Sequence, residues 1–74
     1  MINIIILECQ FNRIKYFSNF SENMINLYCY GNHIKSLNNL PNNLQVLDCS
    51  DNNLKTLNNL PNSLTHLNYS FNQV

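Results

Sequence analysis

Three cysteines are spaced twenty residues apart, at Cys9, Cys29 and Cys49, and thiols are common ligands of zinc. A zinc site usually draws four ligands from closely spaced pairs, whereas Tyr69 occupies the next position of this series. We therefore expect a column of small buried side chains that holds no metal and no cofactor. The odd number of cysteines is not typical of a secreted disulfide framework, and it favours an intracellular, cytoplasmic protein with reduced thiols.

Two carboxylates could support acid–base chemistry, because Glu8 and Asp48 occupy the same repeat position. They are forty residues, or two repeats, apart in the sequence. They are expected two strands apart on an open sheet, without a cleft between them. Gly31 is the only glycine, which excludes a Gly-rich phosphate loop. No serine or cysteine is accompanied by a base and an orienting third group, so we predict that the chain is not an enzyme.

The charges argue against nucleic acid and membrane partners. Four basic and four acidic residues give a formal net charge of zero, which provides no attraction to phosphate backbones or anionic lipid. The apolar run in MINIIILECQ is too short to span a bilayer and lacks the basic residues of a secretory leader. Lys15, Lys35 and Lys55 recur at one repeat position; they could form an anion or acidic-peptide site, but a solvated edge that limits side-on association is the favoured interpretation.

A twenty-residue repeat organises the chain, and its clearest copy is LQVLDCSDNNLKTLNNLPNS at residues 44–63. Further copies occupy residues 4–23 and 24–43, and a shorter one occupies 64–74. Six positions of the repeat are apolar in every copy: Ile4, Met24, Leu44, Leu64; Leu7, Leu27, Leu47, Leu67; Cys9, Cys29, Cys49, Tyr69; Ile14, Ile34, Leu54, Val74; Phe17, Leu37, Leu57; Phe20, Leu40, Leu60. This register predicts one repeat domain over residues 1–74, about three and a half repeats long and without a C-terminal cap.

Alternation of apolar and polar residues at repeat positions three to six predicts a short strand in each copy. Strands of successive copies would lie side by side in a parallel sheet, with positions four and six facing inward. Pro41 and Pro61 disfavour a helix in the returning segments, which we expect to be extended or 3₁₀-like.

Asparagine is unusually frequent, with seventeen of the 74 residues, and one repeat position holds it without exception. These four residues follow the predicted strands, where the chain must turn while its backbone groups become buried. We expect a structural ladder of stacked asparagine side chains at Asn12, Asn32, Asn52 and Asn72. A second ladder is plausible at Asn19, Asn39 and Asn59.

The repeat pattern LxxLxCxxNxLxxLxxLPxx resembles the leucine-rich repeat family over residues 4–74. Its length and its closing Leu-Pro pairs (Leu40-Pro41 and Leu60-Pro61) are similar to the short class found in bacterial effectors and giant-virus proteins. Asn38 and Asn58 depart from the effectors, which usually have a further proline there, and the Asn, Ile, Lys and Tyr bias favours giant-virus relatives. The resemblance implies a leucine-rich-repeat solenoid with short parallel β-strands on a concave face that binds other proteins.

Several residues outside the core positions would lie on or beside this concave face. Tyrosines are enriched in binding hot spots, and carboxylates would favour a partner segment with a basic residue. We therefore predict a non-catalytic protein-interaction module whose site comprises Ile6, Glu8, Tyr28, Tyr30, Val46 and Asp48. Ordinary decoration of a sheet face is an equally weighted interpretation. The alternative function is a structural unit, or a fragment of a longer repeat protein, that forms homo-oligomers through its C-terminal edge.

Overall fold

The computed structural model describes residues 4–74 and contains four strands of three residues each. They are β1 (Ile6–Glu8), β2 (Asn26–Tyr28), β3 (Val46–Asp48) and β4 (His66–Asn68). Each strand falls at repeat positions three to five, within the predicted positions three to six and one residue shorter. No residue from 4 to 74 is helical, so the described chain is an all-β structure.

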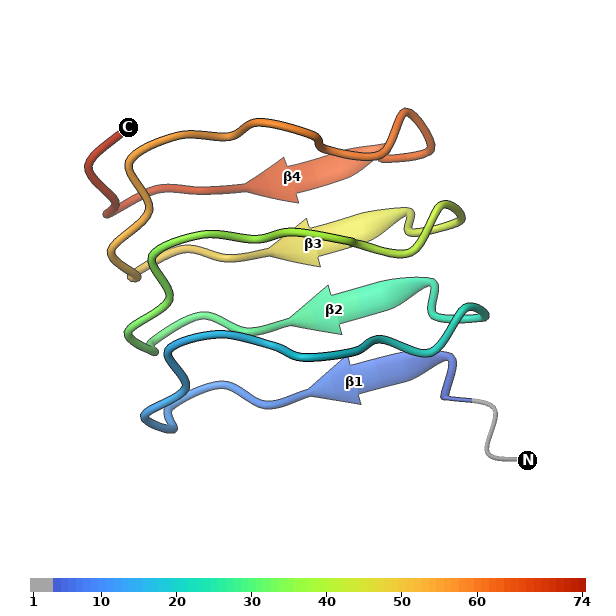
Figure 1. The fold of residues 1–74 in the computed structure, drawn as a ribbon, viewed down its shortest axis with the longest axis horizontal. Coiled ribbons are helices and arrows are strands. Elements are labelled where there is room, and N and C mark those ends of the chain that lie inside the picture. Colours follow the sequence, from blue (N-terminus) through green and yellow to red (C-terminus); the bar gives the residue numbers. More distant parts are fainter. Residues whose placement is uncertain (1–3) are drawn as a thin grey trace.

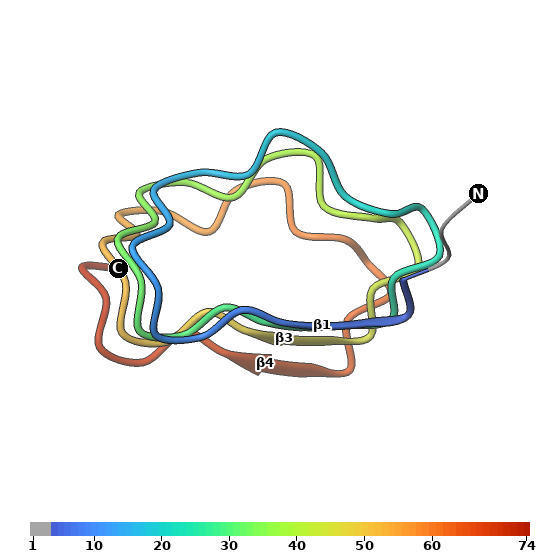
Figure 2. The same cartoon turned by 90° about the horizontal axis from the view of Figure 1, so that it is seen from below.

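The four strands form one parallel sheet in the order of the sequence, β1-β2-β3-β4 (Figure 1). Their register is twenty residues throughout, with Leu7 opposite Leu27, Leu27 opposite Leu47 and Leu47 opposite Leu67. We call residues 4–23, 24–43, 44–63 and 64–74 coils 1 to 4. Figure 2 shows that the returning segments lie opposite the sheet, so that the stacked coils enclose a common interior. This arrangement confirms the predicted parallel sheet and is compatible with a repeat solenoid.

The hydrophobic core fills the interior of coils 2 and 3. Its ten buried apolar residues all occupy the predicted core positions: Met24, Leu27, Cys29, Ile34, Leu37, Leu40, Leu44, Leu47, Cys49 and Leu54. The same positions are only partly buried in coil 1 (Leu7, Cys9, Ile14) and more exposed in coil 4, because an end coil is covered on one side only. Burial of each core residue therefore depends on the two coils that flank it.

A left-handed residue follows each strand, at the eighth position of each coil. Phe11, Gly31, Asp51 and Phe71 have φ values of 57°, 70°, 53° and 56°. Gly31 is needed here for space as well as for its φ, because a Cβ atom at Gly31 would lie 2.6 Å from Cδ1 of Phe11. The chain thus reverses direction at this position in every coil, just before the repeated asparagine.

The returning segments turn a second time before the next strand. Asn39 and Asn59 adopt φ values of 58° and 62°, a conformation that asparagine tolerates better than most residues. Pro41 and Pro61 follow, and their carbonyl oxygens accept hydrogen bonds from the amides of Leu44 and Leu64. The returns are therefore extended segments joined by turns, with no 3₁₀-helix in residues 4–74. Nor does that stretch contain a helix with the length and apolarity to cross a membrane.

Candidate partner-binding face

The outer face of the sheet carries two parallel rows of side chains. Leu27 and Leu47 point into the core, so the residues on either side of them point outward. The strand register then defines one row of Ile6, Asn26, Val46 and His66, and a second row of Glu8, Tyr28, Asp48 and Asn68. Neither row contains a lysine or an arginine, whereas the second contains two carboxylates. The face is therefore acidic.

Tyr28 lies between the two carboxylates of its row, because β2 pairs with β1 at Glu8 and with β3 at Asp48. The Tyr28 side chain is half-buried, and its hydroxyl accepts a weak hydrogen bond from Asn26 Nδ2 at 3.5 Å. A shallow depression opens beside the ring, bordered by Tyr28, Val46, Asp48 and His66. An apolar ring flanked by acidic groups can bury the aliphatic part of a basic side chain while its charge meets a carboxylate.

The Asp48 carboxylate is oriented by the turn that follows β3. Its Oδ1 accepts hydrogen bonds from the Ser50 amide at 3.1 Å and from the Ser50 hydroxyl at 2.7 Å. Asn68 makes the equivalent two bonds to Ser70, at 3.1 and 2.8 Å. An amide oxygen therefore serves this turn as well as a carboxylate does, and the negative charge of Asp48 is not required by the fold.

Three residues of the predicted site do not border this depression: Ile6, Glu8 and Tyr30, although Glu8 pairs with Tyr28 across the strands. Tyr30 follows the end of β2, and its ring packs edge-on against Phe11, with centroids 5.3 Å apart. Ile6, which is 56% exposed, is separated from Val46 by Asn26 on the intervening strand. The structure thus groups Glu8, Tyr28, Val46 and Asp48, and it leaves Tyr30 and Ile6 at the margin.

Sequence reasoning missed several residues that border the depression, among them His66, and one aromatic contact. His66 pairs with Val46 on the neighbouring strand and borders the depression, although as an exposed histidine it carried no signal of a role. Phe11 was assigned to no site, yet its ring covers Gly31 and contacts Tyr30. The only sequence signal for this contact is the single glycine at a position that holds larger residues in the other coils.

The three cysteines form an inward column of free thiols. Cys29 and Cys49 are fully buried and Cys9 is half-buried. Burial raises the pKa of all three thiols, to about 11 for Cys49, and the nearby Asp48 carboxylate adds to the effect at Cys29 and Cys49. A protonated, buried thiol is a poor nucleophile and a poor metal ligand. Within residues 4–74, no three histidine, cysteine or acidic side chains gather closely enough to hold a metal ion.

The repeated asparagines satisfy backbone groups at the turn that follows each strand. Asn32 is 6% exposed; its Nδ2 donates to the carbonyl oxygen of Cys29 at 3.0 Å and to that of Cys9, in the preceding coil, at 3.1 Å. Its Oδ1 accepts from the amides of Asn12 and Ile14, both at 3.1 Å. Asn52 donates to the equivalent carbonyl groups of coils 2 and 3, and Asn72 to those of coils 3 and 4; each accepts an amide of the preceding coil. Each of these side chains therefore joins two coils.

The expected second ladder is wrong. In the part of the chain that the structure describes, the exposed side chains of Asn19, Asn39 and Asn59 form no ladder of hydrogen bonds between coils. Asn39 and Asn59 instead serve the turn through their left-handed backbone conformation. A polar side chain that faces water can bond to solvent, so its recurrence at one position does not imply stacking.

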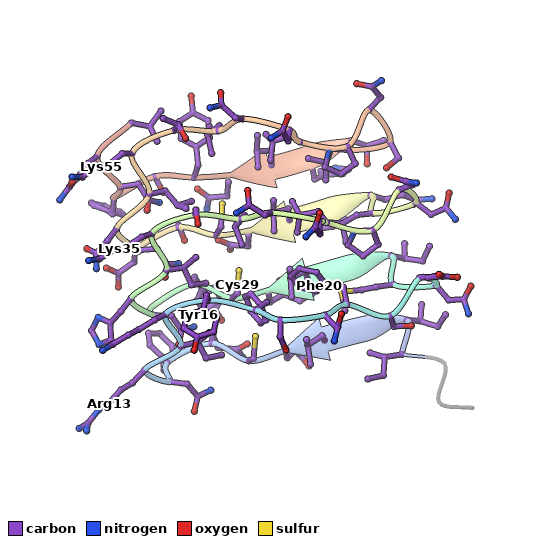
Figure 3. All side chains as sticks on the ribbon, viewed as in Figure 1. Arg13, Tyr16, Phe20, Cys29, Lys35 and Lys55 are labelled. Atoms are coloured by element: carbon purple, nitrogen blue, oxygen red, sulfur yellow. The ribbon has the colours of Figure 1, made fainter. Side chains whose placement is uncertain are left out.

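The basic residues lie away from the acidic face. Figure 3 shows Arg13, Lys35 and Lys55 along one edge of the molecule, on the side towards which the strands run. Lys15, Lys35 and Lys55 are all exposed. The lysines and the arginine therefore lie apart from the Glu8 and Asp48 carboxylates of the sheet face.

Comparison with known proteins gives no match: no protein-family model, no curated protein and no solved structure matches this chain.

Proposed function

We propose that the chain is a short leucine-rich-repeat solenoid that binds a protein partner on its sheet face and performs no catalysis. The twenty-residue strand register and the asparagine bonds between coils support the repeat assignment. The single observation that carries the binding proposal is the position of Tyr28, an aromatic ring between two carboxylates on an open sheet. Buried free thiols support a reducing, intracellular location.

The partner that fits this face is an extended peptide segment with an arginine or lysine. The two outward rows contain two carboxylates and neither lysine nor arginine, so a cation meets complementary charge there. Tyr28 offers a large contact area with few rotatable bonds, which limits the entropy lost on binding. An acidic or nucleic acid partner would instead face repulsion from Glu8 and Asp48.

We expect Tyr28→Ala to weaken peptide binding at least tenfold, which corresponds to about 1.4 kcal/mol. The probes are peptides selected from a random displayed library against the intact protein, which we expect to be enriched in arginine or lysine. Asp48→Asn should weaken the same peptides and reduce the salt dependence of their affinity, because it removes one charge and retains the Ser50 hydrogen bonds. Titration by fluorescence anisotropy at two salt concentrations measures both effects.

The matched control is Tyr16→Ala, which removes an exposed tyrosine from a returning segment instead of the sheet. It should leave the peptide affinity unchanged. Selected peptides without a basic bias, or an affinity that Tyr28→Ala leaves intact, would refute the proposal.

A further inference from the structure

The two end coils expose apolar side chains that the inner coils bury at the same repeat positions. Leu67 is 38% exposed, whereas Leu27 and Leu47 are 0% and 1% exposed. Tyr69 is 44% exposed, at the position where Cys29 and Cys49 are fully buried. At the other end of the stack, Ile4 is 37% exposed against 1% for Met24. Each end therefore exposes the surface that an inner coil uses to contact its neighbour.

The backbone bonds between adjacent coils recur at the same repeat positions: some amides donate to the preceding coil, and two in each inner coil donate to the next coil. The amide at the sixth position donates to the fifth-position carbonyl oxygen of the next coil, as Cys29 does to Asp48 at 2.9 Å. The eighth-position amide donates to the seventh-position carbonyl oxygen, as Asp51 does to Ser70 at 2.8 Å. By this pattern the outer side of coil 4 offers the amides of Tyr69 and Phe71 as donors.

The outer side of coil 1 offers matching acceptors, including the side chain of Asn12. Asn12 Nδ2 donates to the carbonyl oxygens of Cys9 at 2.9 Å and Gln10 at 3.3 Å. Asn32 makes the same two local bonds, so the Asn12 side chain is already oriented as a ladder member. Within the described residues, no donor reaches Asn12 Oδ1, whereas Asn32 Oδ1 accepts two amides of coil 1.

We propose that the 74-residue chain associates head to tail, with coil 4 of one copy stacked on coil 1 of the next in the same twenty-residue register. Asn12 of the second copy accepts from the amides of Asn72 and Val74 and donates to the Tyr69 carbonyl oxygen. The amides of Tyr69 and Phe71 donate to the second copy's Glu8 and Gln10 carbonyl oxygens. β4 and the second copy's β1 thereby continue the parallel sheet whose two edges lie at opposite ends of the stack (Figure 1).

The pattern of donors and acceptors selects a second copy in this orientation. A two-fold dimer through β4 would place the strands antiparallel and would leave Asn12 Oδ1 outside the interface. A head-to-tail contact uses different surfaces on the two partners, so it does not close at two copies and adds further chains. The net charge of zero imposes no overall repulsion between copies.

Sedimentation of the purified chain should show a mass that rises with concentration above the monomer's 8.7 kDa without stopping at twice that value. Tyr69→Arg blocks the coil 4 surface and Ile4→Arg blocks the coil 1 surface. Each variant alone should be monomeric, and an equimolar mixture should form heterodimers only, because each variant retains the surface that the other has lost. Tyr16→Arg makes the same change at an exposed tyrosine away from both surfaces, and it should assemble as the unsubstituted chain does.

Circular dichroism confirms that each variant is folded, and Val74→Lys provides a second block at the coil 4 end, where Val74 is 58% exposed. An unsubstituted chain that stays monomeric at high concentration overturns the proposal. Dimerisation of Ile4→Arg alone would also overturn it, because it would reveal a symmetric contact through coil 4. A mixture of Tyr69→Arg and Ile4→Arg that remains monomeric is a third result that contradicts the proposal.

Discussion

Asn52→Ala is expected to remove about half of the stability of the protein. Asn52 is 7% exposed; its Nδ2 donates to the carbonyl oxygens of Cys29 and Cys49, both at 3.1 Å, and its Oδ1 accepts the Ile34 amide at 3.0 Å. Alanine leaves the buried Ile34 amide without a partner, at about 1–3 kcal/mol, and removes one of the two side-chain donors to each carbonyl oxygen, at about 0.5–1.5 kcal/mol for each bond. A domain of 74 residues has a free energy of unfolding on the order of 7 kcal/mol, so we expect a loss of about half or more of it.

Urea unfolding followed by circular dichroism measures this loss, and Asn58→Ala is the matched control. Asn58 is exposed and lies on a returning segment of the same coil, so its substitution should change the free energy of unfolding by less than about 0.5 kcal/mol. Equal effects of the two substitutions would show that the asparagines at the strand ends are not structural.

Leu47→Ala should lower the free energy of unfolding by about 2–5 kcal/mol, because it opens a cavity between coils 2 and 4. Leu47 is 1% exposed, and its strand pairs with β2 on one side and β4 on the other. Leu67→Ala removes the same side chain at the same repeat position where it is 38% exposed, and it should cost less than half as much.

The difference in free energy of unfolding between the two variants shows whether a leucine stabilises the protein through coverage by a coil on each side or simply through its apolar side chain. Calorimetric or urea-induced unfolding of the two variants provides the comparison. If Leu67→Ala destabilises the protein as much as Leu47→Ala does, then burial does not depend on coverage by a coil on each side, contrary to the structure.

The sheet could be predicted from the sequence because its residues repeat at a fixed interval. The fourth position of each copy is leucine, and the sixth is cysteine in the first three copies. These two positions specify both the inward face and a register of twenty residues. The asparagine at each strand end could be recognised for a related reason: a turn that recurs with buried backbone groups needs the same donors and acceptors in each copy.

The left-handed turn residue before each of these asparagines could not be predicted. Phe11 and Phe71 have no preference for a positive φ, so only Gly31 and, more weakly, Asp51 indicated it. The same limit applies to Tyr30, which was predicted to lie on or beside the face that carries Tyr28. Its ring instead packs against Phe11, a contact set by turn geometry that periodicity does not encode.

Hydrogen exchange of the asparagine side-chain amides, followed by NMR, tests the central claim most directly. We expect strong protection of the Nδ2 protons of Asn32 and Asn52, which bond to carbonyl oxygens of two coils. The backbone amides of Ile34 and Leu54, which bond to Asn52 and Asn72, should also be protected. Asn39 and Asn59, exposed on the returning segments, should exchange as in a free peptide. Uniformly fast exchange of all asparagine side chains would contradict the stacked-coil structure.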